Sequence, residues 1–202
     1  KICGISDPKT LTYIVNHPHP PQFVGFIVNW KASSRYVEPD RLKELLNIDK
    51  KKSKYVAVIV KNDESTLEKI KDLPFDYYQM YDCSPEEIIK IKEKYNKKII
   101  AALTIKNKED VIKYKNYENV SDIILFDGPG MAESIGFNHD LLYEVPEHIN
   151  KMIAGNIKVE DLPNFKNKDY ILDVSGSLEN QRGIKDINKI DKFLNTVHNI
   201  TT

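Results

Sequence analysis

The chain has 202 residues, of which 41% are hydrophobic and 30% are charged, a composition typical of one globular domain. Its 30 basic and 30 acidic side chains give a net charge of zero, which argues against broad electrostatic binding to nucleic acid. The sequence has no 18-residue apolar run, signal-peptide pattern or cysteine framework, so we expect a cytoplasmic protein without membrane partners.

Short segments rich in β-branched or aromatic residues recur along the chain at the spacing of a strand plus a crossover helix. We predict strands over residues 1–5, 23–28, 55–60, 77–80, 98–103, 123–126, 151–154 and 170–174. The runs at residues 55–60 and 99–103 are almost continuously apolar, as in parallel strands that are covered on both faces.

Helix-start signals follow several of these segments. The sequences at residues 6–8, 63–64, 84–87 and 107–110 each offer an N-cap, and the first and third place proline in the first helical turn. Apolar residues recur at helical spacing from Ile88 to Tyr95 and from Ile187 to Val197. The alternation predicts an α/β protein, a (β/α)8 TIM barrel forming a single domain over residues 1–202, with an open doubly wound sheet as the alternative.

In such a barrel the active site lies at the C-terminal ends of the strands. Asp127 follows the strand at 123–126 and shares the face of Ile123 and Leu125. Partial desolvation there would raise its pKa and suit a general acid, whereas a simple turn residue is the alternative. Cys3, near the end of the first strand, is a candidate proton acceptor if its pKa is lowered, or else a small buried apolar residue.

The loops after the seventh and eighth predicted strands have the composition of an anion site. Gly155-Asn156 and Ser175-Gly176-Ser177 allow backbone N–H groups to approach a phosphate closely. Phosphate binding at this place is frequent in (β/α)8 barrels. The serine–glycine stretch is alternatively only a loop or a helix cap.

Arginine is rare in this lysine-rich chain, which contains only Arg35, Arg41 and Arg182. Arg35 lies in the loop after the second predicted strand and is a candidate for bidentate binding of a carboxylate. Asp173, at the end of the eighth predicted strand, either braces the barrel rim or contacts the substrate.

Six motifs in this order resemble the phosphoribosylanthranilate isomerase family over nearly the whole chain. They are KICGI at residues 1–5, GFIV at 25–28 with SRY at 34–36, Asp127 after ILF, AG at 154–155, DVSGSLE at 173–179 and GIKD at 183–186.

The resemblance implies the Amadori rearrangement of N-(5-phosphoribosyl)anthranilate to 1-(2-carboxyphenylamino)-1-deoxyribulose 5-phosphate in tryptophan biosynthesis. It implies Asp127 as general acid, Cys3 as general base and Arg35 as the residue that holds the anthranilate carboxylate. From their positions we add Asp173 and Tyr81 as candidate substrate-binding residues. The implied phosphate ligands are Gly136, Gly155, Asn156, Ser175, Gly176 and Ser177. It implies a phosphorylated small molecule as partner and neither metal nor organic cofactor; we expect a monomer.

The chain departs from the family pattern at four places. Tyr81 replaces the histidine of the family's strand-four motif, so its role in the pocket is altered. The stretch at 134–138 lacks the family's lysine and much of its glycine, and the later loops read GN and SGS instead of GG and SSG. A phosphosugar epimerase or lyase on the same fold, and a non-catalytic barrel that binds a phosphorylated ligand, therefore stay as alternatives.

Overall fold

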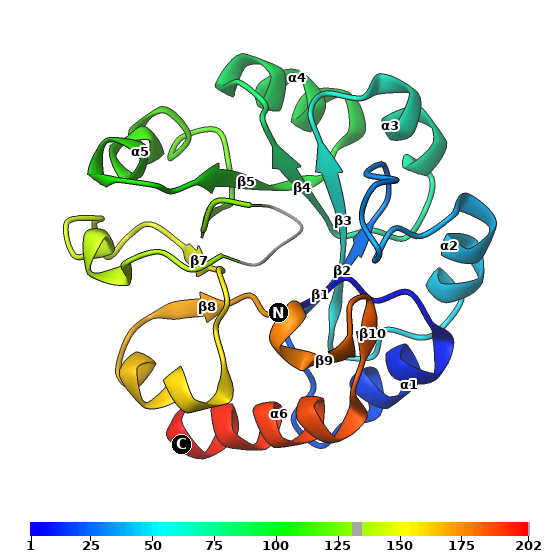
Figure 1. The fold of residues 1–202 in the computed structure, drawn as a ribbon. Helices are drawn as coiled ribbons and strands as arrows, with labels where there is room; N and C mark the ends of the chain where they lie inside the picture. The colour runs from blue at the N-terminus through cyan, green and yellow to red at the C-terminus, as the bar shows by residue number, and fades with distance from the viewer. Residues whose placement is uncertain (131–134, 202) are drawn as a thin grey trace.

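The computed structural model describes residues 1–130 and 135–201 and contains a curled sheet of eight parallel strands (Figure 1). The strands are β1 (Ile2–Cys3), β2 (Phe23–Ile27), β3 (Lys54–Val60), β4 (Tyr77–Tyr81), β5 (Lys98–Thr104), β6 (Ile123–Asp127), β7 (Lys151–Ile153) and β8 (Tyr170–Leu172). Each strand pairs with the next one in the sequence, so all carboxyl ends meet along one edge of the sheet. The eight predicted strands are confirmed.

The first strand and the segment after the last strand also lie side by side. Val174 forms an isolated parallel bridge with Ile2. The backbone N–H of Cys3 donates to the carbonyl of Val174 at 2.9 Å, and the N–H of Val174 donates to the carbonyl of Lys1 at 3.0 Å. These bonds hold the segment after β8 beside β1.

Helices surround the outer side of the sheet (Figure 1). The α-helices of the described residues are α1 (Pro8–Asn16), α2 (Pro39–Leu46), α3 (Glu64–Ile70), α4 (Pro85–Tyr95), α5 (Lys108–Ile112) and α6 (Ile187–Thr201). The four predicted caps are confirmed, because Asp7, Asp63, Ser84 and Asn107 each accept a hydrogen bond from a backbone N–H of the first turn. At Ser84 the capping box with Glu87 is complete.

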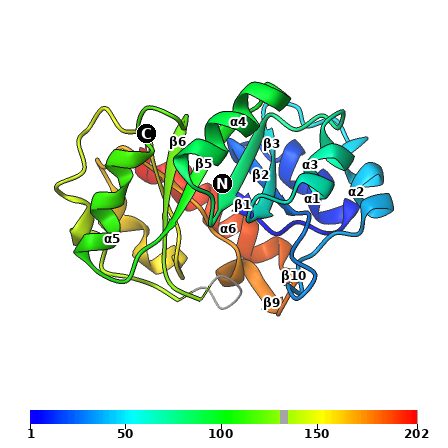
Figure 2. The same cartoon turned by 90° about the horizontal axis from the view of Figure 1, so that it is seen from above.

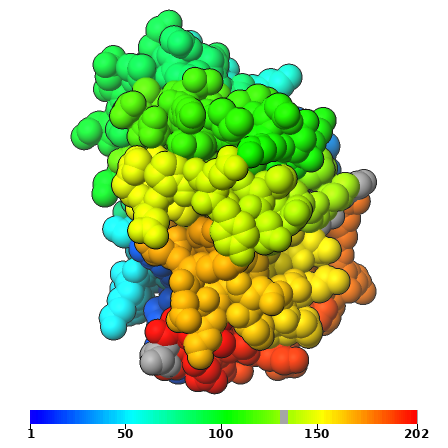
Figure 3. Space-filling view, turned by 90° about the vertical axis from the view of Figure 1, so that its left-hand side faces the viewer, coloured from blue at the N-terminus to red at the C-terminus, as the bar shows by residue number. Residues whose placement is uncertain are grey.

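The expectation of eight regular strand–helix units is wrong after β6 and β7. There the described chain forms the 3-10 helices η2 (His139–Leu142) and η3 (Val159–Phe165), which lie on the face seen in Figure 3. Pro163 inside η3 lacks the N–H that an α-helix would need at that position. A further 3-10 helix, η1 (Lys113–Asn116), extends α5.

A β-hairpin that the sequence analysis did not predict follows β8 and the 3-10 helix η4 (Gly176–Leu178). It consists of β9 (Glu179–Gln181) and β10 (Ile184–Lys185) and lies beside the loop after β2 (Figure 2). Gly183 in its turn has a φ of +87°, and a Cβ atom there would lie 2.6 Å from the carbonyl oxygen of Ser34. Only glycine allows this turn and this close approach together.

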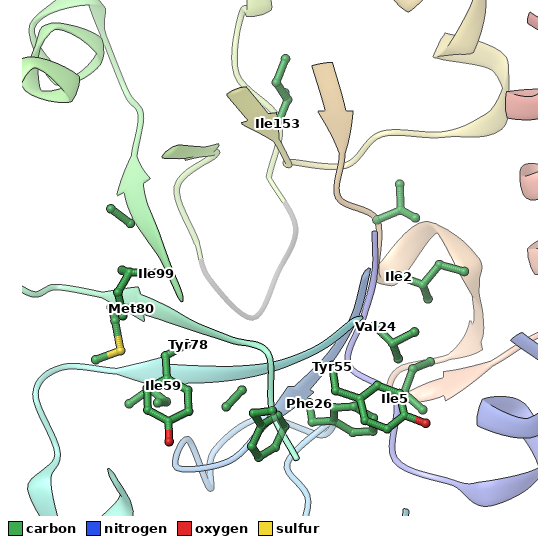
Figure 4. Packing of buried hydrophobic residues seen from close by; sticks show 14 of the residues in the cluster. Ile2, Ile5, Val24, Phe26, Tyr55, Ile59, Tyr78, Met80, Ile99 and Ile153 are labelled. Atoms are coloured by element: carbon green, nitrogen blue, oxygen red, sulfur yellow. The ribbon is translucent and has the colours of Figure 1, made fainter. Parts of the chain in front are cut away.

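Alternation along the strands divides the buried residues between two clusters. Ala57 and Ile59 belong to the larger cluster between sheet and helices, part of which Figure 4 shows, whereas Val58 and Val60 belong to the cluster inside the curl of the sheet. Burial of each such aliphatic side chain contributes about 1.5–3 kcal/mol. Ile123 and Leu125 are in the inner cluster, so Asp127 continues the inward row at the carboxyl edge.

No helix within the described ranges is long and apolar enough to cross a membrane.

Candidate active site

A cavity opens at the carboxyl ends of the strands and collects most of the predicted site residues. Its walls include Cys3, Arg35, Tyr81, Asp127, Gly155, Asn156, Asp173, Ser175, Gly176 and Ser177. Gly136 is the one predicted site residue that is not among the lining residues. Strand parity and the shared carboxyl edge explain the gathering, because each side chain follows the inner row of its strand or lies in the loop beyond it.

Asp127 is the last residue of β6, and its carboxyl group faces a largely desolvated environment. Its Oδ2 atom accepts a hydrogen bond of 2.8 Å from the hydroxyl of Tyr81, the last residue of β4. Burial raises the pKa of Asp127 to about 6, although the bonds from Tyr81 and from the backbone N–H of Gly128 oppose that rise. A carboxyl group with this pKa is partly protonated near neutral pH and can donate a proton, as the sequence analysis expected of a general acid.

Cys3 ends β1 and is a free thiol that lines the cavity. Burial raises the pKa of its thiol, while the side-chain ammonium groups of Lys1 and Lys185 act in the opposite direction. The lowered thiol pKa that was expected of a base is therefore not found, because desolvation outweighs the two nearby cations. The thiolate is a minor form at neutral pH, but it is a stronger base for that reason.

Asp173 is held by Lys1 through a buried ion pair of 2.7 Å between Nζ and Oδ2. The Lys1 side chain is fully buried, and its ammonium group also interacts with the Cys3 thiol. Within the part of the chain that the structure describes, the buried Oδ1 of Asp173 has no hydrogen-bond partner. One carboxyl oxygen of Asp173 therefore braces the rim, whereas contact of the other oxygen with a substrate stays a prediction.

Arg35 is already engaged by a protein carboxylate. Its Nε and Nη2 atoms donate to Glu179 Oε1 and Oε2 at 2.6 and 2.9 Å, and Lys185 Nζ lies 2.6 Å from Glu179 Oε1. Burial alone would raise the pKa of Glu179, but these cations hold it at about 2. Two buried cations, Arg35 and Lys185, thus share the carboxylate of Glu179.

The loops after β6 and β7 pack backbone against backbone. Gly155 has a φ of +99°, and a Cβ atom there would lie 2.9 Å from the carbonyl oxygen of Ile135. At Gly128 a Cβ atom would come within 1.7 Å of the same oxygen. Gly136 packs against Gly155, with its own Cβ position 3.3 Å from the Gly155 carbonyl, so it supports the loop wall. Of the altered stretch at 134–138, Ser134 lies outside the described residues.

The loop after β8 is built around Ser175, whose hydroxyl has protein partners on both sides. It donates to the carbonyl of Cys3 at 3.0 Å and accepts from Lys185 Nζ at 3.1 Å. Gly176 and Ser177 follow at the start of η4 and line the cavity beside Asn156, which has a φ of +54°. Among the predicted phosphate ligands, the hydroxyl of Ser175 thus has a structural role as well.

Three buried polar residues of the site, Lys1, Gln79 and Lys185, were not predicted from the sequence, and Glu179 was given no role. The quoted motifs contain Lys1, Glu179 and Lys185, and this was the available signal for them. Composition alone does not distinguish these two lysines from the many exposed ones. No group of three or more His, Cys, Asp or Glu side chains in the described ranges could hold a metal ion.

The sequence and the fold of this chain are both similar to those of known proteins. The family model described as N-(5'phosphoribosyl)anthranilate (PRA) isomerase matches residues 1–196. The N-(5'-phosphoribosyl)anthranilate isomerase of Agrobacterium fabrum is 31% identical over 98% of this chain and 94% of its own length. The crystal structure of phosphoribosyl anthranilate isomerase from Thermotoga maritima superposes with a TM-score of 0.86 at 21% identity, covering 98% of this chain and 97% of that one. A related enzyme structure, in complex with reduced 1-(o-carboxyphenylamino)-1-deoxyribulose 5-phosphate, superposes with a TM-score of 0.84 at 22% identity and covers 98% and 97%.

Proposed function

Because the chain belongs to the N-(5'-phosphoribosyl)anthranilate isomerase family of tryptophan biosynthesis, we propose that Asp127 and Cys3 are its catalytic acid and base. The observation that carries this assignment is a carboxyl group with a pKa of about 6 in the same cavity as a thiol beside a buried ammonium group. The alternatives of an epimerase, a lyase or a non-catalytic barrel receive no comparable support.

The proposed reaction needs one proton donor and one proton acceptor. Asp127 protonates the ribose ring oxygen as the bond from that oxygen to C1′ breaks, and the anilino nitrogen forms a C=N bond. Cys3, as the thiolate, removes the proton from C2′, which gives an enolamine that tautomerises to the ketone. C2′ is oxidised and C1′ is reduced within one molecule, so the step is an intramolecular redox isomerisation of the aldose–ketose type.

The remaining contacts concern the two anionic ends of the substrate. We assign the anthranilate carboxylate to Arg35, because its guanidinium lines the cavity and is held in the cavity wall by Glu179. We assign a ribose hydroxyl to the Oδ1 atom of Asp173 and a contact in the pocket wall to Tyr81.

We assign the phosphate to the loops after β6, β7 and β8. Gly155, Asn156, Gly176 and Ser177 line the cavity there, Ser175 fixes the last loop, and Gly136 supports the wall from behind.

The test is turnover of phosphoribosylanthranilate, generated in situ from anthranilate and phosphoribosyl pyrophosphate and followed by the loss of substrate fluorescence. Asp127→Asn and Cys3→Ser should each lower kcat by about 10²–10⁴-fold while product-analogue binding is largely retained. A variant with near wild-type kcat would show that its residue is not the acid or the base.

The proposal also covers barrel closure, the number of domains, localisation and oligomeric state. The bridge between Ile2 and Val174 supports a closed (β/α)8 barrel, and one continuous sheet supports a single domain over residues 1–202. We keep the expectation of a cytoplasmic monomer. The Thermotoga maritima relative is described as dimeric, so light scattering of the purified protein decides the oligomeric state.

A further inference from the structure

The hydroxyl of Tyr81 stands between Gln79 and Asp127 in the inner wall of the cavity. It donates to Asp127 Oδ2 at 2.8 Å, and Gln79 Nε2 donates to the phenolic oxygen at 3.3 Å. Both side chains come from β4 and are buried, with Gln79 only 1% exposed. Since the phenolic oxygen accepts from the amide, its own hydrogen is left for the carboxyl group.

Charged and titratable groups approach Asp127 from several elements. Tyr81 comes from β4, Lys1 directly precedes β1, and Asp173 follows β8. Cys3, at the end of β1, acts on Tyr81. Lys1 acts on Asp127 through its charge, and the Gly128 N–H donates a backbone hydrogen bond. Tyr81 differs from both because its side chain donates a hydrogen bond to one specified oxygen of the carboxyl group.

We propose that Tyr81 is a positioning residue for Asp127. The Tyr81 hydroxyl keeps Oδ2 of Asp127 an acceptor, so the transferable proton resides on the other carboxyl oxygen of Asp127. The proposal rests on the proposed role of Asp127 as general acid. It gives a specific role to a position at which this chain departs from its family.

Tyrosine suits this role for a physical reason. Burial and the neighbouring carboxylates raise the pKa of Tyr81 well above its usual range, so the phenol keeps its hydrogen at every pH at which the enzyme works. An imidazole at this position would change its charge near neutral pH. The phenol therefore supplies a donor to Asp127 that does not vary with pH.

The hydrogen bond has a measurable consequence for the titration of Asp127. A donated bond favours the carboxylate over the carboxylic acid, so its loss shifts the titration midpoint of Asp127 upward. In Tyr81→Phe we expect a rise of about one pH unit. The direct measurement is carboxyl ¹³C NMR of protein labelled at aspartate, with the Asp127 signal assigned by its absence in Asp127→Asn.

Tyr78 offers a matched control on the same strand. It belongs to the larger cluster between sheet and helices, and its hydroxyl is buried without a hydrogen-bond partner among the described residues. Tyr78→Phe removes a buried phenolic oxygen from β4 without touching Asp127. Its Asp127 midpoint should equal that of the wild type, which separates the specific contact from any general effect of changing β4.

The pH dependence of kcat/KM gives a second readout that a merely structural role would not move. The active form has Asp127 protonated and Cys3 deprotonated. The pKa of Asp127 is lower than that of Cys3, so kcat/KM is nearly constant between the two pKa values. The fall of kcat/KM at low pH, the low-pH limb of the profile, follows the titration of Asp127. Tyr81→Phe should move this limb upward by the amount seen in the NMR titration and lower kcat about tenfold with little change in KM.

The outcomes distinguish the role of Tyr81 from the acid role of Asp127. An Asp127 midpoint that does not move in Tyr81→Phe, together with an inactive Asp127→Asn, overturns the role of Tyr81 and leaves the acid in place. An active Asp127→Asn overturns the acid assignment and this proposal with it. A raised midpoint, a shifted limb and an unaffected Tyr78→Phe support the proposal.

Discussion

Arg35 and Glu179 form a buried bidentate ion pair that connects the loop after β2 with the hairpin strand β9. The two N–O distances are 2.6 and 2.9 Å, and both side chains are at most 6% exposed. Lys185 shares the same carboxylate at 2.6 Å. The pair fixes the guanidinium at the cavity wall, so the position of the proposed carboxylate ligand depends on a residue far away in the sequence.

Removal of the Glu179 charge should therefore destabilise the fold strongly. Glu179→Gln removes the carboxylate that the buried cations Arg35 and Lys185 share, and we expect a loss of about 3–5 kcal/mol in the free energy of unfolding. Urea denaturation at pH 7 measures it. Glu44→Gln is the control, because the Arg41–Glu44 pair is exposed and should contribute under about 1 kcal/mol. Equal losses in the two variants would contradict this account.

The carboxylate of Glu179 should also make the free energy of unfolding depend on pH. The pKa of Glu179 is lowered from 4.5 to about 2 in the folded protein, so its contribution is complete above pH 4.5 and is lost as the pH falls toward 2. The difference in unfolding free energy between the wild type and Glu179→Gln should shrink over that interval. A difference that stays constant from pH 5 to pH 2.5 would argue against the ion pair as its source.

Asp127 should reduce stability near neutral pH. Its pKa is raised from 3.8 to about 6, so the folded state holds the proton more tightly and stability falls as the pH rises between these values. Asp127→Asn has no charge to desolvate and should be more stable than the wild type by up to about 3 kcal/mol at pH 7. Denaturation at pH 4 and pH 7 tests this, since the advantage should largely disappear at pH 4.

Gly155 should be required for the geometry of the phosphate loops. Gly155→Ala places a side chain at a φ of +99°, with its Cβ 2.9 Å from the Ile135 carbonyl oxygen. We expect a loss of at least about 1 kcal/mol in stability and a higher KM, because the backbone must move at the proposed phosphate site. Calorimetry and steady-state kinetics measure the two effects. An unchanged KM would place the phosphate elsewhere.

Tyr78→Phe should be neutral or stabilising. The Tyr78 hydroxyl is buried and has no hydrogen-bond partner within the described part of the chain, so its removal relieves a desolvation penalty of about 1–3 kcal/mol. Thermal unfolding provides the measurement. A clear loss of stability would indicate that the hydroxyl has a partner such as a bound water molecule.

The sequence by itself determined the order of the strands, the helix caps and the loops in which the site lies. These features depend on local signals, namely apolar runs such as residues 55–60, the capping box at Ser84 and the motif around Cys3. The 3-10 crossovers η2 and η3 and the β9–β10 hairpin were not predicted, because short irregular segments are defined by packing against neighbours more than by their own pattern.

Only the tertiary structure decided how the site residues act on one another. Composition could not separate Lys1 and Lys185 from the exposed lysines, since burial results from the packing of strands that are distant in the sequence. The contact of Tyr81 with Asp127 and the engagement of Arg35 by Glu179 likewise join residues 46 and 144 positions apart. The shifted pKa values of Tyr81, Asp127 and Glu179 follow from desolvation and from such pairs. Both causes arise only when the curled sheet brings its carboxyl ends together.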